Sequence, residues 1–474
     1  MPPSAAYRPS LRHADLGHAF YDVVTAAEFP ELRLRYRNQR WAARVGLDTL
    51  NDAEWIAHFG RFEPLPGTFA QPLALRYHGH QFQVYNPFLG DGRGFLFAQL
   101  HDLRDGRLLD LGTKGSGRTP WSRGADGRLT LKGGVRELLA SAMLEALGVD
   151  TSKTFSLIET GEALARNDEP SPTRSSVLVR LSHSHVRIGT FQRFAYYDDQ
   201  ASLERLLDHT VRTYLPEAWR DDPPARAAAF LEAVCARVAR LGAQWTAAGF
   251  VHGVLNTDNI NVTGESFDYG PWRFLPTYDP GFTAAYFDEG GLYAFGRQPV
   301  SLSWNLTRLA ECLLPLAERE ALEAALATFQ PRFRVELAQA VLRRLGLQSR
   351  GSEADGALVE ALFDFLEQAQ PPFEQVFFDW RGGTASRERA ARGPIADAYR
   401  HAASGPFMSA LEGFAPSGEA ALDHAYFAGE RPCTMLIDEV EAIWAAIAER
   451  DDWQPLADKL KAIDLMAGAY GNLA

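Results

Sequence analysis

The sequence predicts an α+β protein in two parts, a first part of mixed strands and helices and a second part that is mainly helical. Short apolar runs separated by turns rich in Gly, Asp and Ser recur through residues 76–200. From Leu203 onward, apolar residues follow helical spacing through long segments rich in Ala, Leu, Glu and Arg. With 474 residues, the chain is long enough to bury more than one hydrophobic core.

The composition excludes several classes of protein. Hydrophobic residues make up 46% and charged residues 23% of the chain, as in ordinary globular proteins. The formal net charge of −12 argues against a nucleic-acid binder with a broad basic surface. No apolar run approaches the roughly 18 residues of a membrane span, and no apolar segment follows a basic start as in a secretory signal. We therefore expect a cytoplasmic protein that does not bind membranes.

The three cysteines, Cys235, Cys312 and Cys433, are scattered and form no C-x-x-C pair. Such an arrangement predicts no disulfide framework. Cys235 and Cys312 lie within apolar helical patterns, where a cysteine behaves as a small core residue.

A lysine and a glutamate form the first candidate pair of functional residues. Lys114 follows the strand-like run 107–112 and is bordered by glycines. Glu137 lies in the first turn of a helical pattern that begins near Val135 and ends at Gly148. Protein kinases use a strand lysine and a helix glutamate in this order to hold a nucleotide phosphate. Alternatively, Glu137 is only a first-turn glutamate favoured by the helix dipole.

A Gly-rich turn and two arginines are further candidates for phosphate binding. The turn Gly90-Asp91-Gly92-Arg93-Gly94 precedes the strand-like run 95–100 and could bring backbone N–H groups close to phosphate oxygens. Asp-Gly also marks an ordinary hairpin, and the turn matches neither the P-loop nor the dinucleotide-binding pattern. Arg180 lies on the second of two predicted strands, 154–160 and 176–182, and Arg187 follows it. Arginine binds phosphate oxygens in a bidentate way.

The second part of the chain is predicted to consist of helices that build and cover one lobe. A helix is expected from the start signal Asp221-Asp222-Pro223-Pro224 to about Ala248, and Gly249 ends it. Later helices are expected at about 301–316, 318–346, 355–370, 432–449 and 453–468.

The stretch His252-Gly253-Val254-Leu255-Asn256-Thr257-Asp258-Asn259, followed by Asp268-Tyr269-Gly270, resembles a kinase metal site. Kinases take a metal ligand from the Asn of H-R-D-L-x-x-x-N and another from the Asp of D-F-G. Asn259 and Asp268 match those positions, whereas Val254 replaces the catalytic base and an acid, Asp258, appears beside Asn259. Hard oxygen ligands suit Mg²⁺. The alternative is an Asn- and Asp-rich turn between two short strands.

His78 and His80, in Tyr77-His78-Gly79-His80, invite a metal-binding interpretation. No partner ligands follow at a suitable spacing, so a structural role is expected for both.

Taken together, these motifs resemble the selenoprotein O family, a pseudokinase-like group of protein adenylyltransferases. The resemblance extends from about Tyr77 to Leu316. It is carried by YHGHQF, GDGRG, LGTKGSGRTPWSR-x-x-DGR, VRELLASAMLEALG, LSHSHVRIGTF, HGVLNTDNI and DYGP. Members of this family often carry a C-terminal selenocysteine or cysteine motif for redox control. No cysteine follows Cys433 in this sequence, so the resemblance does not carry over redox gating by a terminal thiol.

The resemblance implies a function for each matching residue. It implies a kinase-like two-lobe fold in which Glu137 pairs with Lys114 and Asp258 is the proton acceptor. It implies Asn259 and Asp268 as ligands of Mg²⁺ or Mn²⁺. ATP contacts are implied for Gly90, Gly92, Arg93, Lys114, Asp126, Gly127, Arg180 and Arg187.

The activity implied is transfer of AMP from ATP, bound inverted relative to kinases, to Ser, Thr or Tyr hydroxyls of target proteins. A protein kinase that transfers the γ-phosphate and an inactive pseudokinase scaffold are the alternatives. Val254 at the base position argues against the kinase, and retention of Lys114, Glu137, Asn259 and Asp268 argues against the scaffold. A monomer is expected.

Three regions are predicted. Residues 1–75 form an N-terminal extension packed on the lobes, and residues 76–200 form the phosphate-binding N-lobe. Residues 201–474 form the helical C-lobe with the catalytic and metal loop at 252–270.

Overall fold

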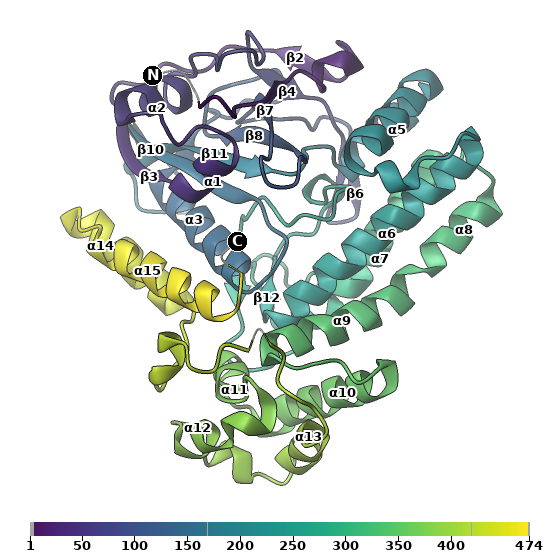
Figure 1. Cartoon of the computed structure of the whole chain (residues 1–474). Coiled ribbons are helices and arrows are strands. Elements are labelled where there is room, and N and C mark those ends of the chain that lie inside the picture. The colour runs from purple at the N-terminus through teal and green to yellow at the C-terminus, as the bar shows by residue number, and fades with distance from the viewer. Residues whose placement is uncertain (1–3, 168, 419, 473–474) are drawn as a thin grey trace.

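An antiparallel sheet forms the centre of one lobe, and a set of long helices forms the other (Figure 1). The computed structural model describes residues 4–167, 169–418 and 420–472. Within these residues the sheet has nine strands, in the order β2-β4-β7-β8-β11-β10-β3, with β1 beside β7 and β9 beside β11. The predicted α+β fold class and the two-lobe, kinase-like arrangement are confirmed.

The described strands are β1 (Pro9–Ser10), β2 (Tyr21–Val23), β3 (Arg33–Arg37), β4 (Leu73–Leu75), β5 (Gly79–Gln81), β6 (Val84–Asn86), β7 (Leu96–His101), β8 (Leu108–Lys114), β9 (Leu129–Thr130), β10 (Lys153–Leu164), β11 (Thr173–Ser182), β12 (Phe250–Val251) and β13 (Arg273–Phe274). The pairs β5–β6 and β12–β13 form two small sheets of their own.

The described helices are α1 (Gln39–Arg44), α2 (Asp52–Phe59), α3 (Leu131–Ala146), α4 (Ile188–Tyr196), α5 (Gln200–Tyr214), α6 (Pro223–Ala247), α7 (Gln298–Leu313), α8 (Arg319–Ala327), α9 (Phe329–Leu345), α10 (Ser352–Ala369), α11 (Phe373–Asp379), α12 (Arg387–Arg392), α13 (Ser404–Leu411), α14 (Ile437–Arg450) and α15 (Gln454–Ala469). Short 3₁₀ turns connect several of them, among them η3 (Thr257–Asn259). None of the described helices has both the length and the apolar character needed to cross a lipid bilayer.

The inner strands are apolar because both of their faces are covered. Every residue of β8 is buried, and β7 and β11 are buried almost throughout. One face packs on α1 and α2, where Trp55 stacks on Phe155 with ring centroids 4.9 Å apart. The other face packs on α3, whose Leu138 and Leu139 are fully buried. Strand β8 and helix α3 therefore hold Lys114 and Glu137 on rigid elements.

Residues from the predicted N-terminal extension join the main sheet. Strands β2 and β4 pair with each other at one edge, β3 pairs with β10 at the opposite edge, and β1 pairs with β7. Residues 24–32 connect the two edges and are held by backbone hydrogen bonds from Ala27 to Ser116 and from Glu31 to Thr160.

The helical lobe is organised around α6. Asp222 caps its N-terminus by accepting from the backbone N–H of Ala225, and Pro223 and Pro224 occupy the first helical positions, as the sequence predicts. Helix α6 packs against α7, α8 and α9. The single helix predicted over 318–346 is wrong, because the structure has α8 and α9 with a break at Thr328. Pro331 lies in the first turn of α9, where its missing N–H is tolerated, but it cannot continue a helix from α8.

The two C-terminal helices return to the other lobe. The sequence predicted helices at 432–449 and 453–468 as cover for the second lobe, and both exist as α14 and α15. They pack against α3 instead, as the yellow ribbons beside α3 show (Figure 1). The side-chain amide of Asn472 also donates to the carbonyl of Ala146 at the end of α3.

Candidate active site

The loop after α6 is attached to the D-x-G segment through a histidine. His252 follows β12 and is buried, and its Nε2 lies 3.0 Å from the carbonyl oxygen of Phe267. Burial lowers the pKa of His252, so the ring is neutral and suited to this hydrogen bond. The contact joins residues 252–259 to Asp268, as the kinase pattern predicts.

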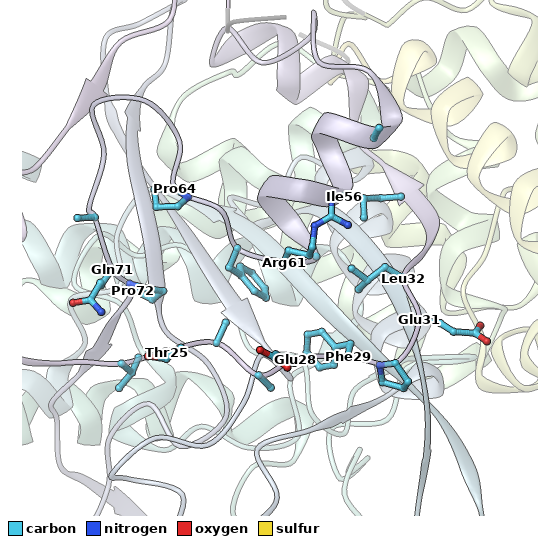
Figure 2. A pocket seen from close by; sticks show the side chains of 18 residues that line it. Thr25, Glu28, Phe29, Glu31, Leu32, Ile56, Arg61, Pro64, Gln71 and Pro72 are labelled. Carbon is cyan, nitrogen blue, oxygen red and sulfur yellow. The ribbon is translucent and has the colours of Figure 1, made fainter.

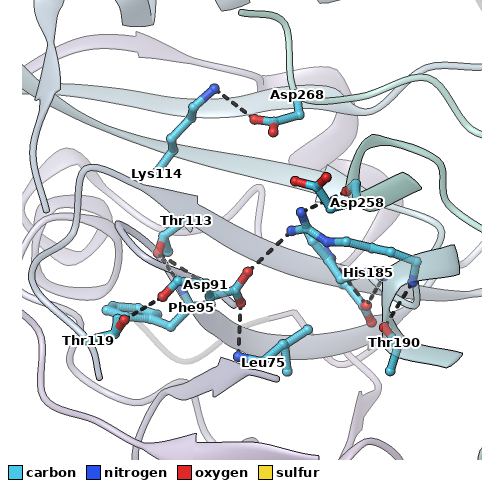
Figure 3. A network of polar contacts seen from close by, with 12 residues as sticks. Leu75, Asp91, Phe95, Thr113, Lys114, Thr119, His185, Thr190, Asp258 and Asp268 are labelled. Atoms are coloured by element: carbon cyan, nitrogen blue, oxygen red, sulfur yellow. Dashed lines mark hydrogen bonds and ion pairs between the residues drawn. The ribbon is translucent and has the colours of Figure 1, made fainter. Parts of the chain in front are cut away.

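Lys114 contacts both predicted acids. Its Nζ makes an ion pair with Glu137 of α3 and lies 2.8 Å from Oδ1 of Asp268 (Figure 3). The side chains of Lys114 and Glu137 are only 6% and 5% exposed, so the pair is shielded from water. The pairing predicted from the sequence is therefore present, and it includes Asp268 as a third member.

Two arginines complete a positive cluster around Asp268. Arg180 on β11 places Nη1 3.3 Å from Oδ1 of Asp268. The guanidinium carbons of Arg180 and Arg187 each lie 5.0 Å from the centre of the Phe267 ring. Burial alone would raise the pKa of Asp268, but the charges of Lys114, Arg180 and Arg187 outweigh it and hold that pKa well below its usual range. Asp268 is therefore ionised at neutral pH.

Arg187 links the Gly-rich turn to the loop that carries Asp258. Its Nη2 lies 3.2 Å from Oδ1 of Asp91, and its Nη1 donates to the backbone carbonyl of Asp258 over 3.1 Å. Asp91 also accepts from the backbone N–H of Leu75 through Oδ2 (Figure 3). From the sequence, Asp91 is expected only as part of a glycine turn, and its pairing with Arg187 was not predicted.

The carboxylate of Asp258 is buried and incompletely paired. The residue is 8% exposed, and its Oδ1 has no hydrogen-bond partner among the described residues. Burial raises the pKa of Asp258 to about 6, against the lowering effect of Arg187. A carboxylate whose pKa is raised toward neutrality can accept a proton, as a general base does.

Asn259 and Asp268 have the oxygens that a hard divalent ion requires. The side-chain amide of Asn259 donates through Nδ2 to the carbonyl of Val254, which directs its Oδ1 away from that contact. The ion pairs of Asp268 within the described residues use Oδ1, which leaves Oδ2 for a metal ion. The described residues contain no cluster of three or more His, Cys, Asp or Glu side chains suited to a metal. Mg²⁺ often binds through one or two protein oxygens together with substrate phosphates, and this pair fits that use.

The Gly-rich turn borders a groove that reaches the Lys114–Glu137 pair. Arg93, Lys114 and Glu137 line a groove of about 450 Å³ together with residues of the 269–287 segment. Gly90 and Gly92 pack against Trp121, where an added Cβ would meet the indole ring or the Trp121 carbonyl. The two glycines thus allow a close approach of the turn to Trp121.

Asp126 and Gly127 lie apart from the ion-paired cluster. The carboxylate of Asp126 pairs with Arg166, with 2.8 Å between Oδ2 and Nη1. Gly127 has a φ of +71° in the turn before β9, a conformation that favours glycine. Neither contacts Lys114, Asp258 or Asp268 within the described residues, so their predicted ATP contacts remain predictions.

The two histidines of the β5–β6 region are engaged in local hydrogen bonds. The Nδ1 of His78 lies 2.8 Å from the hydroxyl of Tyr85, and the Nδ1 of His80 lies 2.7 Å from Nε2 of Gln192. Burial lowers the pKa of both rings.

None of the residues of the Lys114–Asp268 cluster lines a second groove, of about 900 Å³. Figure 2 shows the side chains that line it. It is bordered by residues 24–32, α2 and the segment around Pro72, with Phe29 and Ile56 among its walls. It lacks the paired lysine, arginines and carboxylates described above, so we place the candidate active site at the ion-paired cluster.

Comparison with known proteins identifies the family. Residues 4–464 match the family described as Protein adenylyltransferase SelO. The chain belongs to the SelO family. Proteins named "Protein nucleotidyltransferase YdiU" are 46% identical in Gloeobacter violaceus, over 95% of this chain and 93% of the relative, and 44% identical in a Synechocystis strain, over 95% and 96%. The relative of that name in Vibrio cholerae is 40% identical, over 75% of this chain and 71% of its own length. The resemblance inferred from the motifs is thereby confirmed, and the chain is a nucleotidyltransferase.

Proposed function

We propose that this chain transfers AMP from ATP to Ser, Thr or Tyr hydroxyls of target proteins, with the nucleotide inverted relative to protein kinases. The observation that carries the proposal is the cluster of Lys114, Arg180 and Arg187 around Asp268. Three cations at one carboxylate provide a binding place for the terminal phosphates of a triphosphate. Arg187 also donates to the backbone carbonyl of Asp258, so phosphates bound at this cluster would lie beside the loop that carries the proposed base.

In the proposed step, the acceptor hydroxyl oxygen bonds to the α-phosphorus of ATP. The bond between that phosphorus and the oxygen bridging to the β-phosphate breaks, and pyrophosphate leaves. The hydroxyl proton passes to the carboxylate of Asp258, whose raised pKa supports this role. General-base assistance of this kind contributes about 10²–10⁴-fold. Lys114, Arg180 and Arg187 hold the phosphates in position and offset the charge on the leaving group.

Asn259 and Asp268 are the residues that would hold Mg²⁺ or Mn²⁺. A divalent ion bound there would neutralise part of the triphosphate charge. The use of Mg²⁺ or Mn²⁺ remains a prediction, as do the cytoplasmic location and the monomeric state.

The kinase alternative is weaker because Val254 occupies the position of the kinase base and cannot accept a proton. The scaffold alternative is weaker because a buried ion-paired network is costly unless it is complete, and this chain keeps Lys114, Glu137 and Asp268 together.

The test supplies ATP labelled at either the α- or the γ-phosphate, together with a divalent metal and a protein acceptor. We expect label from the α-phosphate in protein and a mass increase of one AMP. Label from the γ-phosphate alone would establish the kinase alternative, and no label from either would support the scaffold. Asp268→Ala is expected to abolish transfer while circular dichroism shows that the fold is kept, with a lower melting temperature because Lys114 and Arg180 lose the carboxylate they share.

A further inference from the structure

Two exposed tyrosines and the half-buried Tyr85 form an aromatic surface beside the β5–β6 hairpin. Tyr85 of β6 stacks on Tyr196 at the end of α4, with ring centroids 5.4 Å apart, and Tyr196 meets Tyr197 edge-on at 5.2 Å. Tyr196 and Tyr197 are 54% and 55% exposed. We call Tyr85, Tyr196 and Tyr197 the tyrosine patch. Scattered single apolar residues on a surface are ordinary, but contiguous exposed rings mark a binding surface.

A buried histidine supports the patch from beneath. The ring of His78 lies 5.8, 5.4 and 5.5 Å from the rings of Tyr85, Tyr196 and Tyr197, all in edge contacts. His78 is fully buried and bonds the hydroxyl of Tyr85 through Nδ1. The rings are therefore held in place before any partner arrives, which reduces the entropy lost on binding.

Arg193 adds a cation to the edge of the patch. Its guanidinium carbon lies 5.2 Å from the ring centre of Tyr197, and its Nη1 lies 3.0 Å from Nε2 of His78. Burial lowers the pKa of Arg193. Within the described residues, no carboxylate lies within 4.0 Å of its nitrogens, in contrast to Arg76, which pairs with Asp22. Arg193 thus offers a charge that a carboxylate on a partner can satisfy.

The patch is connected to the loop that carries Asp258. The hydroxyl of Thr257 donates to Oε1 of Gln192 over 2.6 Å, and the hydroxyl of Tyr85 donates to the carbonyl of Gln192 over 3.2 Å. On the hairpin itself, a Cβ at Gly79 would lie 2.9 Å from Oδ1 of Asp258. The patch is therefore adjacent to the group proposed to take the proton from the acceptor hydroxyl.

None of the groups directed at the nucleotide belongs to this surface. Lys114, Arg180 and Arg187 surround Asp268, and Arg93 lies in the groove beside Glu137. Tyrosine and arginine are enriched among the residues that dominate protein–protein binding energy. The second substrate of the proposed reaction is a protein, and its hydroxyl must reach Asp258.

We propose that the tyrosine patch and Arg193 dock the protein acceptor. An apolar or aromatic side chain of the acceptor packs on Tyr196 and Tyr197, and an acidic side chain near it pairs with Arg193. This inference rests on the proposed function and names the chemistry of its protein substrate.

The experiment compares two acceptors of very different size. Reduced, carboxymethylated α-lactalbumin is an unfolded, carboxylate-rich protein, whereas N-acetyltyrosine amide offers the hydroxyl without neighbouring apolar or acidic side chains. Transfer is followed with ATP labelled at the α-phosphate. For a variant with both Tyr196→Ser and Tyr197→Ser, we expect kcat/KM for α-lactalbumin to fall at least tenfold. We expect less than a twofold change for the amide and in KM for ATP.

Two further variants test the specificity of that loss. Arg193→Gln is expected to raise KM for α-lactalbumin about fivefold, and Arg193→Lys is expected to keep it near the original value because the charge remains. Val335→Ser changes an apolar side chain of similar exposure on α9 and is expected to leave both acceptors unaffected.

The outcomes separate the docking proposal from the proposed function. Three results would overturn docking at the tyrosine patch and leave the proposed function standing. In the first two, the tyrosine variant loses activity equally toward both acceptors or toward neither. In the third, the unsubstituted chain shows no preference for α-lactalbumin over the amide. Absence of transfer from the unsubstituted chain to either acceptor would overturn the proposed function, and docking with it.

Discussion

Glu441 of α14 places Oε2 2.7 Å from Nζ of Lys132 on α3, although 309 residues separate the two along the chain. Its Oε1 lies 3.4 Å from Nη1 of Arg136, the residue next to Glu137. The C-terminal pair of helices thus holds the end of α3 from which Glu137 reaches Lys114. A single carboxylate from one end of the chain supports an ion pair of the other lobe.

Reversing the charge of Glu441 tests this support. Glu441→Lys is expected to lower kcat for AMP transfer about three- to tenfold, because α3 loses an anchor and repels the new lysine. The contact is half-exposed, so its contribution to stability is at most about 1 kcal/mol. The double variant with Lys132→Glu restores opposite charges and is expected to recover most of the activity. Equal activity of the single and double variants would contradict the ion-pair explanation.

Removing the carboxylate of Asp91 is expected to weaken ATP binding. Arg187 would lose one of its two anchors, the other being the carbonyl of Asp258. Hydrogen bonds to charged groups contribute about 1.5–3 kcal/mol, so Asp91→Ala is expected to lower kcat/KM for ATP about ten- to hundredfold. Steady-state kinetics with varied ATP would measure the loss, and Asp105→Ala, a change of a more exposed carboxylate, serves as control. Unchanged kinetics for Asp91→Ala would show that the carbonyl of Asp258 alone is enough to hold Arg187 in position.

Position 253 is expected to tolerate no residue other than glycine. Its φ is +83°, and an added Cβ would clash with the carbonyl oxygen of Pro271. Gly253→Ala is therefore expected to destabilise the fold by about 2–4 kcal/mol and to displace the loop that carries Asp258. Gly356→Ala in α10 is the matched control, because its Cβ would point into open space. It is expected to stabilise the chain by about 0.5–1 kcal/mol, and urea unfolding would measure both changes.

A cluster of buried histidines predicts loss of stability in mild acid. Burial lowers the pKa of His13 to about 3 and that of His209 to about 4, with Asp110 and His185 facing His13 as well. The folded state keeps both rings neutral, whereas the unfolded chain binds protons near pH 6.5. Above about pH 6.5 both states keep the rings neutral, so the free energy of unfolding is unaffected. As the pH falls toward 4, the unfolded chain binds protons that the folded chain does not, and the free energy of unfolding decreases by roughly 3 kcal/mol for each ring.

Urea unfolding at pH values from 7 down to 4 would measure this dependence. His13→Leu is expected to flatten the decline between pH 6.5 and 4, because one of the rings that resist protonation is gone. The exposed His401 serves as control, and His401→Gln is expected to leave the decline unchanged. A decline that is equally steep in both variants would assign the effect to other groups.

Local signals in the sequence were sufficient for much of the fold. Asp222 followed by two prolines marks the start of α6, and Gly249 marks its end, because capping and helix termination depend on near neighbours. Local patterns predicted a strand before Lys114 and a helix around Glu137, and the order of lysine and glutamate in protein kinases suggested their pairing. Resemblance to a known family supplied the roles of Asp258 and Asn259, which residue spacing alone left open.

Contacts between distant segments carried no local signal. The pairing of Glu441 with Lys132 depends on where α14 packs, and helical spacing predicts only that α14 exists. The sequence offered no reason to connect Asp91 with Arg187, which lie 96 residues apart.

The break between α8 and α9 was missed because the amphipathic pattern continues across Thr328 while Pro331 interrupts the backbone.

The return of α14 and α15 to α3 has a consequence for biosynthesis. The ribosome makes the chain from its N-terminus, and domains fold as they emerge. The sheet, Lys114 and Glu137 are all present long before residues 437–469 leave the ribosome, yet α3 receives these contacts only from that last segment. A nascent chain that has already formed its first lobe therefore still lacks the final support of the Lys114–Glu137 ion pair until translation is nearly finished.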